Sequence, residues 1–147
     1  MGSLKPQLVL AEQSAMTGGY FDRRTLGLTR TVTRKSKGAE TSVGSVSVLI
    51  LRGLPQSLFR AVAAHECCHA WARLRGIRQS KVEEEGLAEV ISHRYLTRLG
   101  GPDHKVLAKG IEESRLPVYG TGFRSVNAAV QHVGLKRYLA TLKSSAR

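Results

Sequence analysis

The alternation of apolar and polar positions divides the chain into a first third with the two-residue period of strands and a remainder with helical spacing. The strongest strand pattern covers residues 43–52, where β-branched residues are frequent and apolar residues recur at every second position. Residues 25–35 alternate in the same way, with threonines that are typical of a partly exposed strand. An apolar run within residues 7–12 predicts a third, short strand.

After Gly53 the apolar residues recur with helical spacing. A first helix is predicted over residues 55–74, since a proline suits a first turn and a glycine, at position 76, suits the end. Further helices are predicted over residues 81–99, from about 102 to 114, over 123–133 and over 135–142, with Gly134 between the last two. A proline and two glycines predict a turn-rich loop over residues 117–124. The whole pattern predicts an α+β fold.

The composition favours one domain that covers residues 1–147. Hydrophobic residues make up 41% of the chain, which is enough for a core. No apolar run is long enough to span a membrane, and the N-terminus lacks the pattern of a secretion signal. The only two cysteines are adjacent and give no disulfide framework, which fits a reducing compartment. We therefore expect a cytoplasmic protein without a membrane partner.

The charge is strongly positive. The chain has 23 Lys and Arg against 11 Asp and Glu, a net charge of +12. Such a surface attracts acidic partners and attracts nucleic acid non-specifically. Aromatic residues make up only 5%, and no nucleic-acid-binding module is recognisable, so we do not expect specific binding of nucleic acid.

The segment from His65 to His69 carries the strongest chemical signal, because it has the pattern H-E-x-x-H within a predicted helix. Residues four apart lie on one face of a helix, so the two histidines can hold one metal ion. Glu66 can then reach a water molecule at that metal. The pattern predicts the core of a zinc peptidase site, although a surface helix can also carry it by chance.

Cys67 and Cys68 occupy the two variable positions of this pattern. The histidines already take the side of the helix that faces the metal. We therefore interpret both cysteines as small, buried packing residues and not as ligands.

Catalytic zinc usually takes three protein ligands, so a third is expected beyond the motif. Glu85 and Glu89 share a helix face, whereas His93 is about 12 Å from Glu85 along the axis and cannot share its ion. The acidic run 83–85 also fits a solvated helix N-terminus. The residues alone leave seven candidates open: Glu83, Glu84, Glu85, Glu89, His93, His104 and His132.

Family resemblance narrows this choice. Residues 85–88, Glu-Gly-Leu-Ala, resemble the zinc-binding segment of the aminopeptidase N-like gluzincins, in which the Glu directly before Gly is a ligand. Ordered blocks resemble even more closely the peptidase domain of the plant "DA-one" growth regulators, which are ubiquitin-activated peptidases. The blocks lie at residues 8–12, 48–55, 65–71, 82–86, 90–93, 117–124 and 134–136.

The resemblance implies a zincin-like (gluzincin) fold, with a small antiparallel N-terminal sheet packed on the active-site helix and a helical C-terminal half. It implies that His65, His69 and Glu85 hold Zn²⁺. Glu66 is then the general base for the water that attacks a protein or peptide substrate.

Further roles around the site follow from the resemblance and from the chemistry of the residues. The resemblance makes Tyr119 a candidate donor to the oxyanion, although a structural tyrosine is the alternative. Arg124 either anchors the loop around Tyr119 or binds substrate. Glu89 and His93 are expected to orient the ligands, and residues 46–51 are expected to offer a strand edge to an extended substrate.

The plant proteins carry LIM zinc domains and ubiquitin-interacting motifs ahead of the peptidase. This chain has two cysteines and no residues left for such a motif, so we expect a stand-alone peptidase, and the resemblance alone implies regulation by ubiquitin. Two other functions are weighed against it. One is an inactive zincin-like binding module, and the other is a nucleic-acid-associated peptidase of the SprT type, whose third ligand is usually His.

Overall fold

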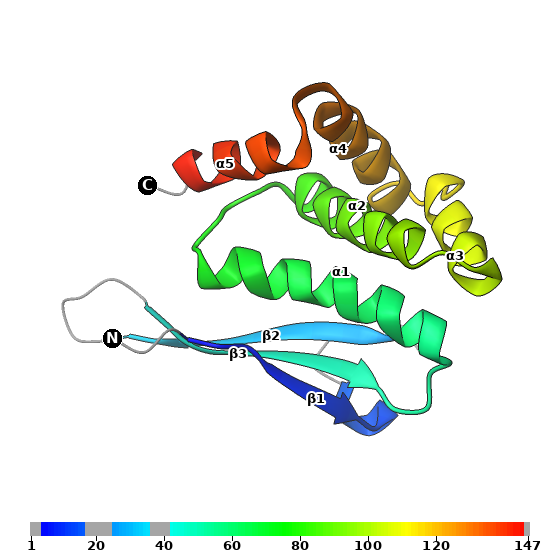
Figure 1. Ribbon diagram of the computed structural model, residues 1–147. Helices are drawn as coiled ribbons and strands as arrows, with labels where there is room; N and C mark the ends of the chain where they lie inside the picture. The colour runs from blue at the N-terminus through cyan, green and yellow to red at the C-terminus, as the bar shows by residue number, and fades with distance from the viewer. Residues whose placement is uncertain (1–3, 17–24, 36–41, 146–147) are drawn as a thin grey trace.

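The computed structural model describes residues 4–16, 25–35 and 42–145. A three-stranded sheet forms one layer, a single helix lies across it, and four further helices lie on the other side of that helix (Figure 1). The predicted α+β class is therefore confirmed. Within the described ranges, no helix is long and apolar enough to cross a membrane.

All three predicted strands form. They are β1 (Gln7–Ala11), β2 (Gly27–Arg34) and β3 (Ser42–Leu51), and a short 3-10 turn, η1 (Gln13–Met16), follows β1. Their order in the sheet is β1-β3-β2. Val46, Val48 and Ile50 of β3 are almost fully buried beneath the helix, as the alternating pattern predicts.

The sheet is mixed and not antiparallel. β2 pairs with β3 in antiparallel register, as predicted, but β1 pairs with β3 in parallel. Because β2 lies between β1 and β3 in the sequence, β1 reaches β3 through a long connection and not through a hairpin.

The prediction that residues 46–51 offer an edge to a substrate is also wrong. These residues belong to β3, which pairs with a strand on each side. The edges of the sheet are β1 and β2, and β2 is the edge from which a side chain reaches the first helix.

The helices follow the predicted spacing closely. They are α1 (Gln56–Leu74), α2 (Lys81–Leu99), α3 (Pro102–Glu112), α4 (Tyr119–Val133) and α5 (Leu135–Ser145). Positive φ angles at Gly76 and Gly134 end α1 and α4, which confirms the breaks expected there. Ser80 and Glu83 form a capping box that starts α2.

The predicted loop over residues 117–124 is largely helical, because α4 begins at Tyr119. Its glycines serve close packing. A Cβ at Gly122 would lie 2.3 Å from the backbone oxygen of Val82, and one at Gly120 would lie 2.0 Å from that of Ser114. The glycines therefore let the start of α4 pack against α2 and against the segment that follows α3, a benefit that outweighs their low helix propensity.

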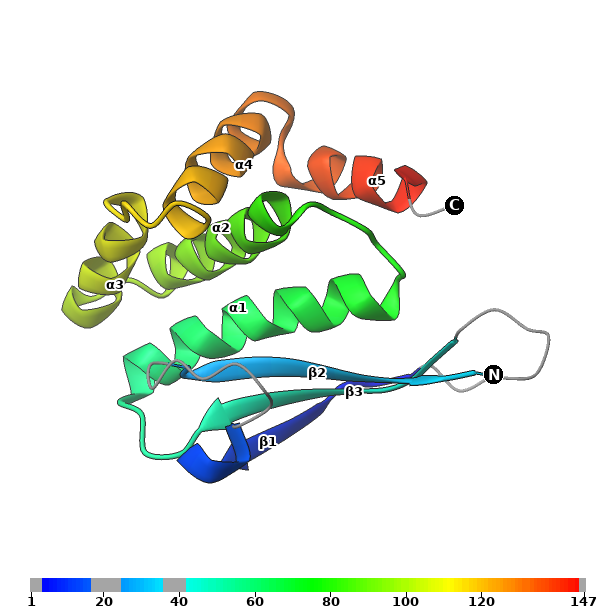
Figure 2. The ribbon, with the colours of Figure 1, turned by 180° about the vertical axis from the view of Figure 1, so that it is seen from behind.

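Two apolar clusters enclose α1. On the sheet side, Ala70 packs with the inward side chains of β3. On the other side, Cys68 packs with a cluster from α2 and α4 that includes Leu87, Val90 and Phe123. Seen from behind, α1 lies between the sheet and the other helices (Figure 2), so its side chains are fixed from both directions.

Candidate metal centre

Three side chains from α1 and α2 converge between these helices. His65 Nε2 lies 3.0 Å from Glu85 Oε2, and His69 Nε2 lies 3.1 Å from His65 Nε2 and 3.3 Å from Glu85 Oε2. The helical repeat places both histidines on one face of α1, and the capping box starts α2 so that Glu85 falls opposite them.

This arrangement fits a metal ion. In tetrahedral zinc sites with bonds of about 2.0–2.1 Å, neighbouring donor atoms lie about 3.3 Å apart. The three donor–donor distances here are 3.0, 3.1 and 3.3 Å. Within the described part of the chain, His65, His69 and Glu85 are the group of His, Cys, Asp and Glu side chains found able to hold a metal. Their two nitrogens and one oxygen match the ligand sets of catalytic zinc.

Charge compensation holds the three groups together. Burial lowers the pKa of His65, but hydrogen bonds to Glu85 and Glu89 outweigh it and raise that pKa to about 9. Burial raises the pKa of Glu85, but hydrogen bonds to His65, His69 and Lys81 outweigh it and hold that pKa well below its usual range. Glu85 is therefore a carboxylate, ready to bind a cation.

Each histidine has a carboxylate near its other ring nitrogen. Glu89 Oε1 lies 3.0 Å from His65 Nδ1, as expected for a residue that orients a ligand. Glu84 Oε1 lies 3.4 Å from His69 Nδ1 and accepts a hydrogen bond of 2.7 Å from Arg73. Of the predicted acidic N-terminus, Glu83 serves the cap, whereas Glu84 faces the site.

Lys81 contacts the site as well, and the sequence analysis did not identify it. Its ammonium pairs with Glu85 Oε1 and leaves Oε2 to the histidines. The four-residue spacing of Lys81 and Glu85 within one helix was a usable signal for this pair.

His93 does not support the ligands. Its Nε2 lies 2.6 Å from Glu112 on α3, and its ring lies 5.2 Å from that of Phe123. Two helical turns separate it from Glu85, so the expectation that it orients a ligand is wrong.

Glu66 is buried beside the metal-ligand group and is held by β2. The hydroxyl of Thr29 lies 2.8 Å from Glu66 Oε2 and 3.0 Å from the backbone oxygen of the same residue. Gly27 leaves the space that Glu66 needs, because a Cβ there would lie 2.7 Å from Glu66 Cγ and 2.5 Å from Val62 Cγ1. The alternating pattern of β2 carried no signal for either contact.

Tyr119 lies at the mouth of the site, at the first residue of α4. Its ring centroid is 6.4 Å from that of His65, and both line a cleft of about 410 Å³ together with Glu66. Burial raises the pKa of Tyr119, and the charge of Glu85 raises it further, so its phenol keeps its proton. Arg124 donates a 2.9 Å hydrogen bond to the backbone oxygen of Ser114 and thus anchors the segment.

The two adjacent cysteines differ in their exposure to solvent. Cys68 is buried, and burial raises the pKa of its thiol to about 12, as suits a packing residue. Cys67 is exposed, which contradicts the prediction that both are buried. Consecutive helical positions are about 100° apart, so Cys67 lies on a side of α1 that no described residue buries.

Comparison with known proteins gives one consistent group of relatives. Residues 8–106 match the family model described as DA1-like, Protein DA1. Protein DA1 of Arabidopsis thaliana is 32% identical over 69% of this chain, and Protein DA1-related 7 of the same plant is 28% identical over 92%. The LIM domain-containing protein HDR3 of Oryza sativa subsp. japonica is 28% identical over 90%.

The chain spans only about a quarter to a third of these relatives, with 24%, 30% and 34% of their lengths aligned. No solved structure matches it significantly. The similarity therefore describes one segment of longer proteins.

Proposed function

The chain belongs to the DA1-like family, and from this premise we propose that it is a zinc-dependent protein endopeptidase of the gluzincin type. The resemblance inferred from the ordered sequence blocks is thereby confirmed. The observation that carries the proposal is the convergence of His65, His69 and Glu85 at distances that suit one ion.

The metal ligands and their partners form a preorganised site. His65 and His69 would hold the ion through Nε2, while Glu89 and Glu84 lie at their other ring nitrogens. Zinc bound there would lower the pKa of a water molecule and polarise the carbonyl of a peptide bond. Lys81 keeps Glu85 turned so that one oxygen remains for the ion.

Glu66 acts as the general base. It accepts a proton from the attacking water and then donates it to the leaving amine. The hydroxyl of Thr29 positions the Glu66 carboxylate. Thr29 is therefore a positioning residue for this step. An intact Glu66 with such support argues for an active peptidase over an inactive binding module.

Tyr119 and β2 complete the proposed substrate cleft. The protonated phenol of Tyr119 donates a hydrogen bond to the oxyanion of a protein or peptide substrate. The edge of β2 replaces β3 as the strand that pairs with an extended substrate. The SprT-like alternative has less support, because Glu85 takes the third position while His93 contacts Glu112.

Comparison of the wild type with Glu66→Gln tests this proposal. Glu66 is not a ligand, so the variant should keep its zinc while cleavage of proteins falls by at least ~100-fold. Cleavage is best followed as new protein N-termini in a complex protein mixture, since such a readout assumes no substrate. Equal cleavage by both forms, or none by the zinc-loaded wild type, would refute the proposal.

A further inference from the structure

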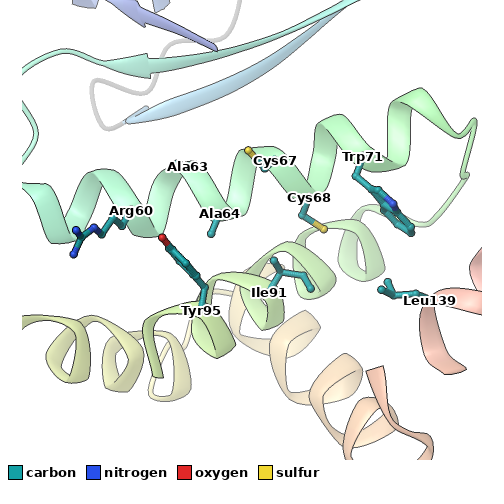
Figure 3. Close-up of a pocket in the computed structure, with 9 residues that line it drawn as sticks. All are labelled: Arg60, Ala63, Ala64, Cys67, Cys68, Trp71, Ile91, Tyr95 and Leu139. Atoms are coloured by element: carbon teal, nitrogen blue, oxygen red, sulfur yellow. The ribbon is translucent and has the colours of Figure 1, made fainter. Parts of the chain in front are cut away.

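A second concave surface lies along α1. Its lining residues on this helix fall at positions 60, 63, 64, 67, 68 and 71, which share one side of the helix. At about 100° per residue, this side is opposite to that of His65 and His69. The surface is a groove of about 490 Å³ between α1, α2 and Leu139 of α5, and we call it the α1–α2 groove (Figure 3).

The α1–α2 groove is almost entirely apolar. Trp71 and Leu139 line one end of it, Ile91 lies near the middle, and the partly exposed ring of Tyr95 lies toward the other end (Figure 3). Cys67 lines this opening and is exposed, because no residue of the described ranges covers α1 there. Exposed apolar grooves of this size in proteins are commonly sites of binding.

Its length fits a helix. The lining residues of α1 extend from Arg60 to Trp71, about 16 Å along the axis at helical rise. That length takes about three turns of a partner helix, whose apolar side chains would recur every three or four residues.

Arginines surround the α1–α2 groove. Arg60 is the charged residue in its lining, and Arg75 lies over the ring of Trp71 with its guanidinium 5.2 Å from the ring centroid. Arg94 and Arg98 line an adjoining depression that shares Tyr95 with the groove. Among the described side chains, none of these four arginines forms an ion pair with a carboxylate.

We propose that the α1–α2 groove is a docking site for an amphipathic helical segment of a partner protein, with apolar anchors on one face and acidic residues beside them. The apolar lining selects the anchors, and the arginines, which have no carboxylate partner among the described side chains, select the acidic flanks. A second copy of the chain is a poor occupant, since its net charge of +12 would be repelled. The inference does not depend on the peptidase reaction.

A synthetic peptide of about 16 residues, with Leu at every third or fourth position and Glu between, is the direct probe. Two control peptides carry the same residues in scrambled order or Lys in place of Glu. Trp71 is the only tryptophan in the chain and lines the groove, so its fluorescence reports on occupancy. The whole 147-residue chain with Glu66→Gln is used, so that the peptide is not consumed, and calorimetry measures the affinity independently.

We expect the acidic amphipathic peptide to bind with a Kd between about 1 and 100 μM, at least ~10-fold more tightly than either control. Tyr95→Ala, and separately the paired change Arg94→Glu with Arg98→Glu, should each weaken binding ~10-fold or more. Val106→Ala and Lys105→Glu, at exposed positions of α3, are the matched controls and should not change it.

Three results would overturn the inference. The first is no saturable signal up to about 1 mM peptide. The second is equally tight binding of the scrambled peptide or of the Lys peptide. That result would indicate non-specific adhesion, or binding to an acidic part of the surface. The third is binding that survives Tyr95→Ala and the paired arginine change. All of these variants alter exposed side chains, and circular dichroism verifies their folding.

Discussion

Each proposed metal ligand has a contact on the side away from the metal. Glu89 lies beside His65, Glu84 lies beside His69, and Lys81 holds the second oxygen of Glu85. Such contacts fix the orientation of a ligand before the metal arrives, which lowers the entropic cost of binding. Much of the proposed chemistry therefore depends on contacts between individual side chains.

The first prediction concerns the proton on His65. Its pKa in the folded protein is about 9, above the usual 6.5, so its stabilising effect on the metal-free fold is complete below pH 6.5 and disappears as pH rises through 9. Zinc needs the neutral ring and must displace this proton. Zinc affinity should therefore rise by up to ~10-fold per pH unit across this range.

Isothermal titration in buffers with different ionisation enthalpies measures both the affinity and the released proton. Glu89→Gln removes one of the interactions that raise the pKa of His65, so the rise in zinc affinity should level off at a lower pH than in the wild type. An affinity for zinc that stays constant between pH 6.5 and 9 would contradict this assignment of the proton.

The second prediction concerns Thr29. Thr29→Val keeps the shape of the side chain but removes the hydrogen bond to Glu66. We expect kcat to fall by about 10- to 100-fold with little change in KM or in zinc content, because only the positioning of the base is lost. Thr29→Ser keeps the hydroxyl and should restore most of the rate. If Val and Ser at this position behave alike, Thr29 has no such role.

At the scale of elements, the crossing of α2 and α4 positions both Glu85 and Tyr119. A Cβ at Gly86, the residue after Glu85, would lie 2.3 Å from the backbone oxygen of Gly122. The two glycines thus pack backbone against backbone, directly beside the proposed ligand and three residues from the tyrosine.

A third prediction follows from this crossing. Gly122→Ala forces α4 away from α2, because its Cβ would meet backbone and not a flexible side chain. The free energy of unfolding should fall by about 1–3 kcal/mol, and zinc affinity should weaken as Glu85 shifts.

Gly110→Ala on α3 is the matched control. Its Cβ would meet nothing within 4 Å, so helix propensity should make it neutral or stabilising by up to ~1 kcal/mol. Denaturant unfolding measures the stability of both variants. An equal loss of unfolding free energy in the two would contradict the packing role of Gly122.

The same crossing shows why sequence reasoning succeeded for some elements and failed for others. The two-residue period of β3 and the prolines and glycines that flank α1 and α2 predicted the limits of these elements closely, and helical spacing alone paired His65 with His69. The glycines around Tyr119 indicated a turn because local propensity cannot reveal a backbone that another helix approaches. Likewise, nothing local to Thr29 reveals that its strand is the edge beside Glu66.

At the scale of the whole molecule, α1 separates two surfaces with different properties. One side of the helix carries the histidines and faces the cleft with Tyr119, and the opposite side forms the α1–α2 groove. Because α1 packs on the sheet with one cluster and on the helices with another, a ligand on either side contacts the same rigid element.

The fourth prediction concerns removal of the metal. An ion held by His65, His69 and Glu85 links α1 to α2, so it stabilises the folded chain by about 4 kcal/mol at zinc concentrations ~1,000 times Kd. For a chain of 147 residues this corresponds to a fall in Tm of about 10 °C when zinc is chelated. Calorimetry with and without a chelator measures the change. The Tm of Glu85→Ala should not respond to the chelator.

Zinc titration of three forms of the chain tests the central claim most directly. The wild type should bind one zinc ion per chain, and Glu85→Ala should lose that binding because it removes a ligand. His93→Ala should bind zinc like the wild type, since His93 contacts Glu112 and not the site. Unchanged zinc binding by Glu85→Ala, or its loss in His93→Ala, would contradict the assignment of the metal centre.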